Sequence, residues 1–199
     1  RGWVDPDDIV RAWQANTSLV TLSHASNVTG VTQEVESIVK VAREREALSL
    51  LDASQSIGHV AVSQYESIAD IIVSPGHKWL MGMHGIAVLY ARQGIHFDPL
   101  IQGGTGSTSE SLEMPVEMQD QVEVGTIDFP AAAALLAGCR WLKEERLESV
   151  AAACKGYAQA CYDELSDIRG VRVITPDPTS GVLGPPIISM VCDGYSPVE

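Results

Sequence analysis

The chain has 199 residues, 45% of them hydrophobic and 20% charged, a composition typical of a folded globular protein. Its 13 basic and 26 acidic residues give a net charge of -13, which disfavours binding to nucleic acid or to an anionic membrane surface. No apolar run approaches the ~20 residues of a membrane span, and no signal-peptide pattern opens the sequence, so we expect a cytoplasmic protein.

Short apolar runs alternate with helical patterns over the first half of the chain. Asp5 and Pro6 have the cap and first-turn character of a helix that ends near residue 15. Helical periodicity follows at 33–46 and 62–68. The predicted strands lack polar alternation and cover 18–23, 47–51, 70–73 and 85–90. This alternation predicts an α/β fold with a mostly parallel sheet covered by helices on both faces.

The second half of the chain has a different pattern. Residues 98–124 are rich in Gly, Ser, Thr and acids, which predicts a long loop of the kind that covers a site or reaches a partner. Helices are expected at 129–142 and 144–166, and short strands at 171–174 and 187–192. We therefore divide the chain into a large-domain core, 1–142, and a connecting helix with the start of a small α+β domain, 143–199.

Cysteine usage indicates neither a disulfide framework nor a metal site. The four cysteines stand at positions 139, 154, 161 and 192, and no two of them have the C-x-x-C spacing of many zinc sites. A chain of this size with an adequate apolar core seldom depends on disulfides. We expect buried free thiols and no bound metal.

Polar segments follow three of the predicted strands, at 23–27, 52–55 and 74–78. Ligands of open α/β sheets bind beyond the carboxyl ends of the strands, where these segments would meet. An acid such as Asp52 and an amine such as Lys78 can then occupy opposite ends of a flat heteroaromatic ring. Pyridoxal phosphate requires that pair, because a carboxylate keeps the pyridine nitrogen protonated while a lysine amine forms a Schiff base and moves protons.

Several segments together resemble the signature segments of class V aminotransferases, PLP-dependent enzymes of fold-type I. They are Ser23–Gly30 (SHASNVTG), Asp52–Ser56 (DASQS) and Gly76–Lys78 (GHK). Residues 103–107 (GGTGS) and 123–126 (EVGT) stand where the family has a glycine-rich loop and a phosphate contact. The cysteine desulfurase and selenocysteine lyase-like subgroup is the most similar. The resemblance implies a PLP-binding large domain, an amino-acid substrate and a homodimer.

The resemblance implies roles for four residues around the cofactor ring. Lys78 would be the Schiff-base lysine and would carry the substrate α-proton, whereas the structural alternative is an exposed surface lysine. Asp52 would pair with the pyridine nitrogen, or simply cap a helix. Gln55 would donate to the phenolic oxygen, and Asn27 would position the substrate or a ring oxygen, although polar loops and turns also contain such residues.

Two more residues are assigned to the phosphate by the same resemblance. His77 would contact it directly, or else pack beside Trp79. Thr126 would reach the phosphate of the neighbouring subunit, or else cap the helix that begins near Phe129. The family usually has Ser or Thr three positions before the lysine, but this chain has Pro75, which offers neither a hydroxyl nor an N–H.

The reaction stays open at this point between sulfur transfer from cysteine, general class V amino-group transfer and carbon-carbon hydrolysis. No cysteine stands at the position of a desulfurase nucleophile, and the upstream phosphate loop and the downstream carboxylate-binding arginine have no counterpart. The chain is therefore expected to be a fragment lacking both ends. It is either part of a PLP enzyme or a truncated, non-catalytic remnant of the fold.

Overall fold

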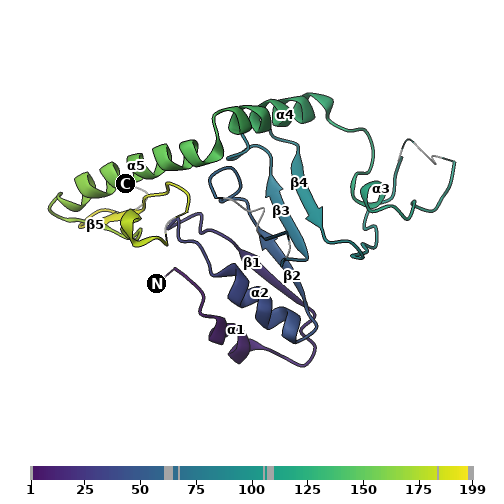
Figure 1. The fold of residues 1–199 in the computed structure, drawn as a ribbon, viewed down its shortest axis with the longest axis horizontal. Helices are drawn as coiled ribbons and strands as arrows, with labels where there is room; N and C mark the ends of the chain where they lie inside the picture. Colours follow the sequence, from purple (N-terminus) through teal and green to yellow (C-terminus); the bar gives the residue numbers. More distant parts are fainter. Residues whose placement is uncertain are drawn as a thin grey trace.

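The computed structural model describes residues 2–60, 65–66, 68–104, 106, 110–182 and 184–196, and a four-stranded sheet forms its centre (Figure 1). The strands lie in chain order and are β1 (Leu19–Ser23), β2 (Leu48–Asp52), β3 (Ile71–Pro75) and β4 (Ala87–Ala91). β1, β2 and β3 are mutually parallel, and β4 runs antiparallel to β3. A parallel β4 would need a longer crossover, usually a helix, than the short link after Pro75 provides.

Helix α2 (Val35–Glu44) covers one face of the sheet. Its buried side chains Val35, Ile38, Val39 and Ala42 follow the predicted helical spacing. One core combines the first three of these with Leu22, Leu51 and Ile72, which stand in register on three adjacent strands. Helix α1 (Pro6–Ala12) packs on α2, and the Asp5 carboxylate accepts from the Asp7 N–H as the predicted cap. The helix expected at 62–68 falls largely outside the described residues.

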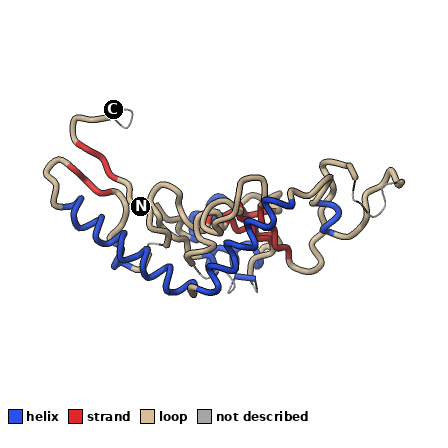
Figure 2. Tube along the Cα trace, turned by 90° about the horizontal axis from the view of Figure 1, so that it is seen from above, coloured by secondary structure: helices blue, strands red, loops and turns tan. Residues whose placement is uncertain are grey.

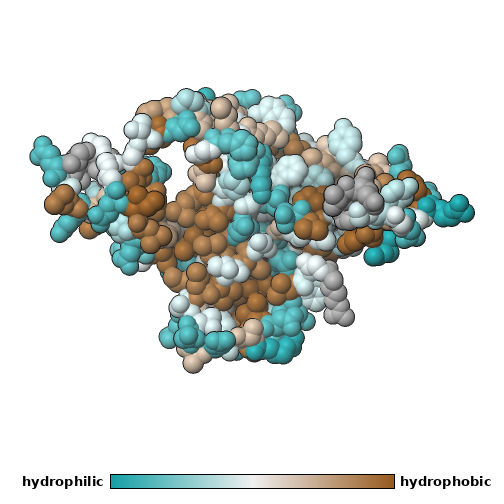
Figure 3. Space-filling model, turned by 180° about the vertical axis from the view of Figure 1, so that it is seen from behind, coloured by the Kyte–Doolittle hydropathy of each residue, from teal (hydrophilic) through white to brown (hydrophobic). Residues whose placement is uncertain are grey.

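The opposite face of the sheet is apolar and partly exposed. Leu19 and Leu48 are paired in register there, with exposed fractions of 44% and 37%. Leu50, Val73 and Leu89 lie on the same face and are half-buried. Figure 3 shows apolar side chains gathered over this side of the molecule. The mostly parallel sheet with packed helices is confirmed, but among the described elements only α2 covers a face of it broadly, and not both faces.

Two long helices connect the sheet to the far end of the molecule. α4 (Phe129–Glu144) is capped by Asp128, whose carboxylate accepts from the Ala131 N–H at 3.0 Å. A Cβ built on Gly138 would stand 2.1 Å from the Leu80 carbonyl oxygen, so α4 lies directly against the loop that follows β3. After a break at Glu145 and Arg146, α5 (Leu147–Ser166) continues away from the sheet, as the tube view shows (Figure 2).

A two-stranded antiparallel sheet of β5 (Val171–Val173) and β6 (Met190–Cys192) packs at the end of α5, with the 3-10 helix η2 (Pro178–Ser180) between the strands in sequence. Both predicted strands are present and shorter than expected. The division of the chain at residues 142 and 143 stays a proposal.

The loop predicted at 98–124 projects from the sheet end of the molecule (Figure 1). Its described residues include the short helix α3 (Met118–Val122), which the composition did not predict. Several apolar side chains on this loop are solvent-exposed, including Leu100 at 99% and Leu112 at 95%.

The four cysteines are free thiols, but the expectation that they are buried is wrong. Cys139 and Cys161 are exposed on α4 and α5, and Cys154 and Cys192 are half-buried. The reason is that α4 and α5 bury few side chains, so most of their positions face solvent. Within the described ranges, no group of three metal-ligating side chains forms, and no helix is long and apolar enough to cross a lipid bilayer.

Candidate active site

A polar cavity of about 480 Å³ opens at the carboxyl edge of the parallel strands. The register pairs Ser23 with Asp52 and Asp52 with Val73, so the segments after the three strands meet at this edge. Four of the six predicted site residues line the cavity. The full lining consists of Gly2, Ser23, Ala25, Ser26, Asn27, Gln33, Asp52, Ser54, Gln55 and Lys78.

Asp52 is the last residue of β2 and is half-buried. Its Oδ1 accepts from the Ser54 N–H at 2.9 Å, a contact that closes the turn after the strand. Lys78 is exposed and lies in the loop that follows β3. Neither side chain forms an ion pair within the described part of the chain. An acid and an amine therefore line the same cavity, and each has capacity left for a ligand.

Gln55 lies beyond Asp52 in the same loop. Its Oε1 accepts from the Trp79 indole N–H at 3.1 Å, and Gln55 also lines the cavity. Asn27 stands at the exposed rim. The turn around Asn27 is held by the Ser26 hydroxyl, which accepts from the Val28 and Thr29 N–H groups at 3.2 and 3.1 Å. Because the Ser26 hydroxyl holds this turn, the Asn27 side chain is not needed for it and can serve a ligand.

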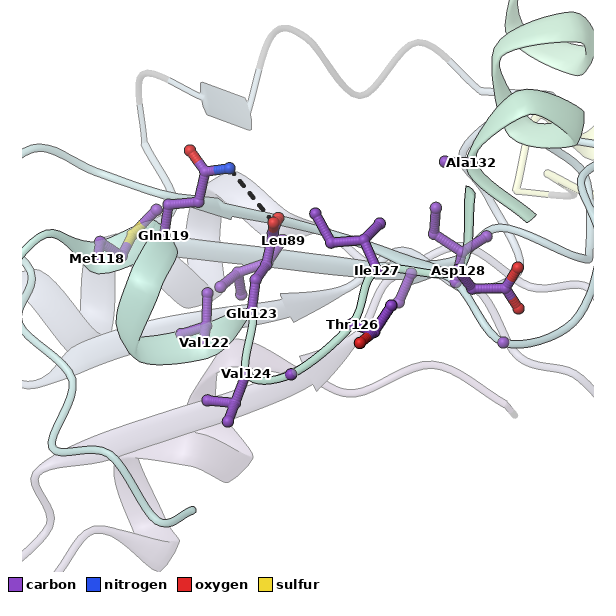
Figure 4. Close-up of a pocket in the computed structure, with 14 residues that line it drawn as sticks. Leu89, Met118, Gln119, Val122, Glu123, Val124, Thr126, Ile127, Asp128 and Ala132 are labelled. Atoms are coloured by element: carbon purple, nitrogen blue, oxygen red, sulfur yellow. Dashed lines mark hydrogen bonds between the residues drawn. The ribbon is translucent and has the colours of Figure 1, made fainter. Parts of the chain in front are cut away.

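His77 and Thr126 do not line the cavity. His77 is exposed and stacks on His84, with ring centroids 4.2 Å apart, so it does not pack on Trp79. Thr126 borders a second cavity of about 840 Å³ between β4 and the segment around α3. Figure 4 shows Thr126 beside Ile127 in this segment. The Gln119 amide of α3 borders the same cavity and donates to Glu123 at 3.3 Å. The helix cap considered for Thr126 is Asp128 instead.

The hydroxyl nearest to Pro75 is also turned away from the cavity. Ser74 is buried, and its Oγ is 3.5 Å from the Ala53 carbonyl oxygen and 3.4 Å from that of Pro75. Pro75 itself is paired with Ala87 in the sheet. Ser74 therefore does not replace the hydroxyl that the resemblance expects at position 75.

Sequence reasoning missed two residues that shape this edge. Gln33 lines the cavity, and its amide accepts from the Val4 N–H at 2.7 Å and donates to the Gly2 carbonyl at 3.1 Å. These contacts tie the N-terminal segment to the site. Only long-range packing shows them, since no local pattern marks a glutamine at the start of a helix as a site residue.

His24 is the second missed residue; it is almost fully buried, between Ser23 and Ala25 of the cavity lining. Its Nδ1 is 2.8 Å from the Ser56 Oγ, and its ring meets Tyr65 edge-on with centroids 4.9 Å apart. Its backbone N–H donates to the Asp52 carbonyl oxygen. Burial lowers the pKa of the His24 imidazole to about 4, so the ring is neutral near pH 7. His24 supports the Asp52 turn from inside the core.

The fold and the residues at the strand ends agree with a match to a known family. The Aminotransferase class-V family profile matches residues 1–197, and the chain belongs to this family. Its relatives include "Probable cysteine desulfurase 2" of Mycobacterium leprae, 32% identical over 197 residues. That match covers 97% of this chain and 46% of the relative.

Solved structures give the same result. The apo structure of a cysteine desulfurase from Thermococcus onnurineus NA1 matches with a TM-score of 0.79 and 29% identity, over 99% of this chain and 49% of that one. The cysteine desulfurase CsdA from Escherichia coli matches with a TM-score of 0.83 over 96% of this chain and 47% of that one, and at 21% identity this likeness concerns the fold. The chain spans about half the length of these relatives.

Proposed function

We propose that this chain supplies the ring-binding part of a PLP-dependent enzyme that acts on an amino acid, most similar in activity to a cysteine desulfurase or selenocysteine lyase. The observation that carries the proposal is the meeting of Asp52, Gln55 and Lys78 at one cavity, from loops after two adjacent parallel strands. Family membership and cysteine desulfurase relatives support it.

The groups at the cavity fit the ring of the cofactor. A carboxylate, an amide and an amine are the partners that a protonated pyridine nitrogen, a phenolic oxygen and an aldehyde carbon require. The phosphate end fits less well among the described residues, because His77 and the Ser74 hydroxyl both lie outside the cavity lining. Bound pyridoxal phosphate would supply an electron sink for a carbanion at the substrate α-carbon.

Each side chain at the cavity would then have its own role toward the cofactor or the substrate. Lys78 would hold the cofactor through its Nζ and move the α-proton of the substrate, since its amine is exposed at the cavity and unpaired by any described acid. Asp52 would keep a proton on the ring nitrogen through its carboxylate. Gln55 would donate from Nε2 to the phenolic oxygen, and Asn27 would orient the substrate from the rim.

In this proposal, part of the phosphate contact comes from a second copy of the chain. Thr126 would serve the site of a second copy, as the resemblance implies for a homodimer. The exposed apolar side chains of the projecting loop, such as Leu100 and Leu112, support burial of this region in a partner. Cytoplasmic location and an amino-acid substrate are part of the same proposal.

Two alternatives to this assignment are considered. A general class V aminotransferase would use the same ring-binding residues. A non-catalytic remnant of the fold is favoured by one observation, namely that His77, which is assigned to the phosphate, stacks on His84 and does not line the cavity.

Titration with pyridoxal phosphate tests the proposal. We expect a visible absorption band near ~420 nm that is lost in Lys78→Ala and kept in Lys155→Ala, an exposed lysine on α5. The absence of any Lys78-dependent band contradicts cofactor binding and favours the remnant.

Activity measurements then separate the two enzymes. Sulfide release from cysteine supports the desulfurase assignment, and amino exchange with alanine or glyoxylate without sulfide supports the aminotransferase. Size-exclusion chromatography that finds only a monomer contradicts the role of Thr126.

A further inference from the structure

Trp79 follows Lys78 directly and contacts the loop that carries the other ring-binding residues. Its indole Nε1 donates to the Gln55 Oε1 at 3.1 Å. An indole nitrogen can only donate, so the Gln55 atom in this contact is its carbonyl oxygen. The Gln55 amide nitrogen is therefore the group left for a ligand, and within the described residues no acceptor takes its protons.

Two further contacts fix the place of Trp79. Its ring meets His59 edge-on, with centroids 4.1 Å apart and an interplanar angle of 78°. A Cβ built on Gly58 would stand 2.4 Å from the Trp79 carbonyl oxygen, so the two backbones are in close contact. All three partners lie within residues 55–59. Trp79 thus joins the loop after β2 to the loop after β3.

We propose that Trp79 is a positioning residue of the site: it orients the Gln55 amide so that the NH₂ group serves the cavity, and it fixes the Lys78 loop against the Asp52 loop. This inference rests on the proposed function, since the oriented amide acts on a bound cofactor. A donor that faces an ionisable oxygen favours the charged form of that oxygen. Loss of the orientation should therefore change the titration of the cofactor and not only the stability of the protein.

The pH dependence of the visible absorption of the PLP-loaded chain tests this role. In Trp79→Phe the ring stays beside His59 but the N–H is lost, and we expect the midpoint of the absorbance transition to rise by about one pH unit. Gln55→Leu should raise it by a similar amount, and the double variant should add nothing further. Trp141→Phe, the same change at an exposed tryptophan of α4, should leave the midpoint unchanged. A midpoint that moves in Gln55→Leu but not in Trp79→Phe overturns the proposal.

A second measurement, without cofactor, keeps this test separate from the proposed function. In ¹⁵N NMR spectra of the chain, the Trp79 indole proton should exchange with solvent roughly tenfold faster in Gln55→Leu than in the parent. The indole signals of Trp3, Trp13 and Trp141 should not change. If the chain binds no pyridoxal phosphate, the proposed function fails while this measurement still reports on the contact. Unchanged exchange at Trp79 shows that Gln55 is not held by it and contradicts the inference.

Discussion

Asp52 and Asp70 stand at opposite edges of the same sheet and have opposite surroundings. Asp70 is buried before β3, where its Oδ2 accepts from the Ser49 N–H and hydroxyl at 2.8 and 2.9 Å and its Oδ1 pairs with Arg92 at 2.7 Å. Asp52 has one backbone partner and lines an open cavity. At the amino ends of the strands, both carboxylate oxygens of Asp70 are thus bound within the protein. At the carboxyl ends, the Asp52 carboxylate can still accept from a ligand.

The environment of Asp70 has an electrostatic consequence. Burial alone would raise the pKa of the Asp70 carboxyl, but the hydrogen bonds from Ser49 and the charge of Arg92 outweigh it and lower the pKa below its usual value. Its contribution to stability is therefore present above about pH 4 and lost as the pH falls through the folded-state pKa.

Replacing each acid separately by alanine should give the largest expected difference in the free energy of unfolding. Asp70→Ala leaves the buried Ser49 N–H and hydroxyl without their acceptor and should lower the free energy of unfolding by about 4 kcal/mol. Asp52→Ala removes one half-buried turn contact and should cost about 1 kcal/mol. Urea denaturation of both variants measures the difference. Equal losses would contradict the division between the two edges.

His24 lies at the same carboxyl edge as Asp52, but it is buried and bonded to Ser56, so its role is in stability. Its pKa is lower in the folded chain than in the unfolded one, so the unfolded state binds more protons between pH 6.5 and about 4. The free energy of unfolding should fall by about 3 kcal/mol as the pH decreases through this window. NMR titration of the His24 ring, alongside unfolding at several pH values, checks the assignment. A ring that is protonated at pH 5.5 in the folded chain would falsify it.

Arg92 tests how much of the Asp70 contact depends on charge. Half of its side chain is exposed, so solvent screens the ion pair. Arg92→Ala should cost about 1 kcal/mol, less than Asp70→Ala, and the cost should shrink in 1 M salt. A salt-independent loss would assign the effect to packing of the Arg92 stem.

Asp52→Asn gives the smallest expected change in stability. The amide oxygen can still accept from Ser54, so the free energy of unfolding should stay within about 0.5 kcal/mol of the parent. Affinity for pyridoxal phosphate should fall about tenfold, because a charged hydrogen bond becomes neutral. Parallel unfolding and binding titrations distinguish the two effects. Unchanged affinity would remove Asp52 from the ring-binding set.

Much of the fold could be predicted from local pattern, because the strands are continuous apolar runs and α2 has clear helical spacing. The same logic placed Asp52 and Lys78 at one edge, since parallel strands end together. The short helix α3 was missed because its sequence, MQDQV, has no apolar periodicity. The antiparallel direction of β4 depends on the length and path of a connection, which apolar character alone does not reveal.

The rest of the site depends on contacts between distant residues. The pairing of His24 with Ser56 and of Gln55 with Trp79 joins separate loops, and a sequence pattern cannot state which polar groups meet. The placement of His77 shows the converse. The resemblance assigns His77 to the phosphate, yet this residue does not line the cavity. A role carried over by resemblance fixes a position and not a contact.

Gly138 carries a constraint on how this protein can vary. Even a methyl group there would collide with the Leu80 carbonyl, and a backbone carbonyl cannot turn aside as a flexible side chain can. Any larger residue must push α4 outward or displace the segment that begins at Lys78. Sequence drift in α4 is thereby restricted by the backbone of the loop that contains Lys78, although Gly138 does not line the cavity.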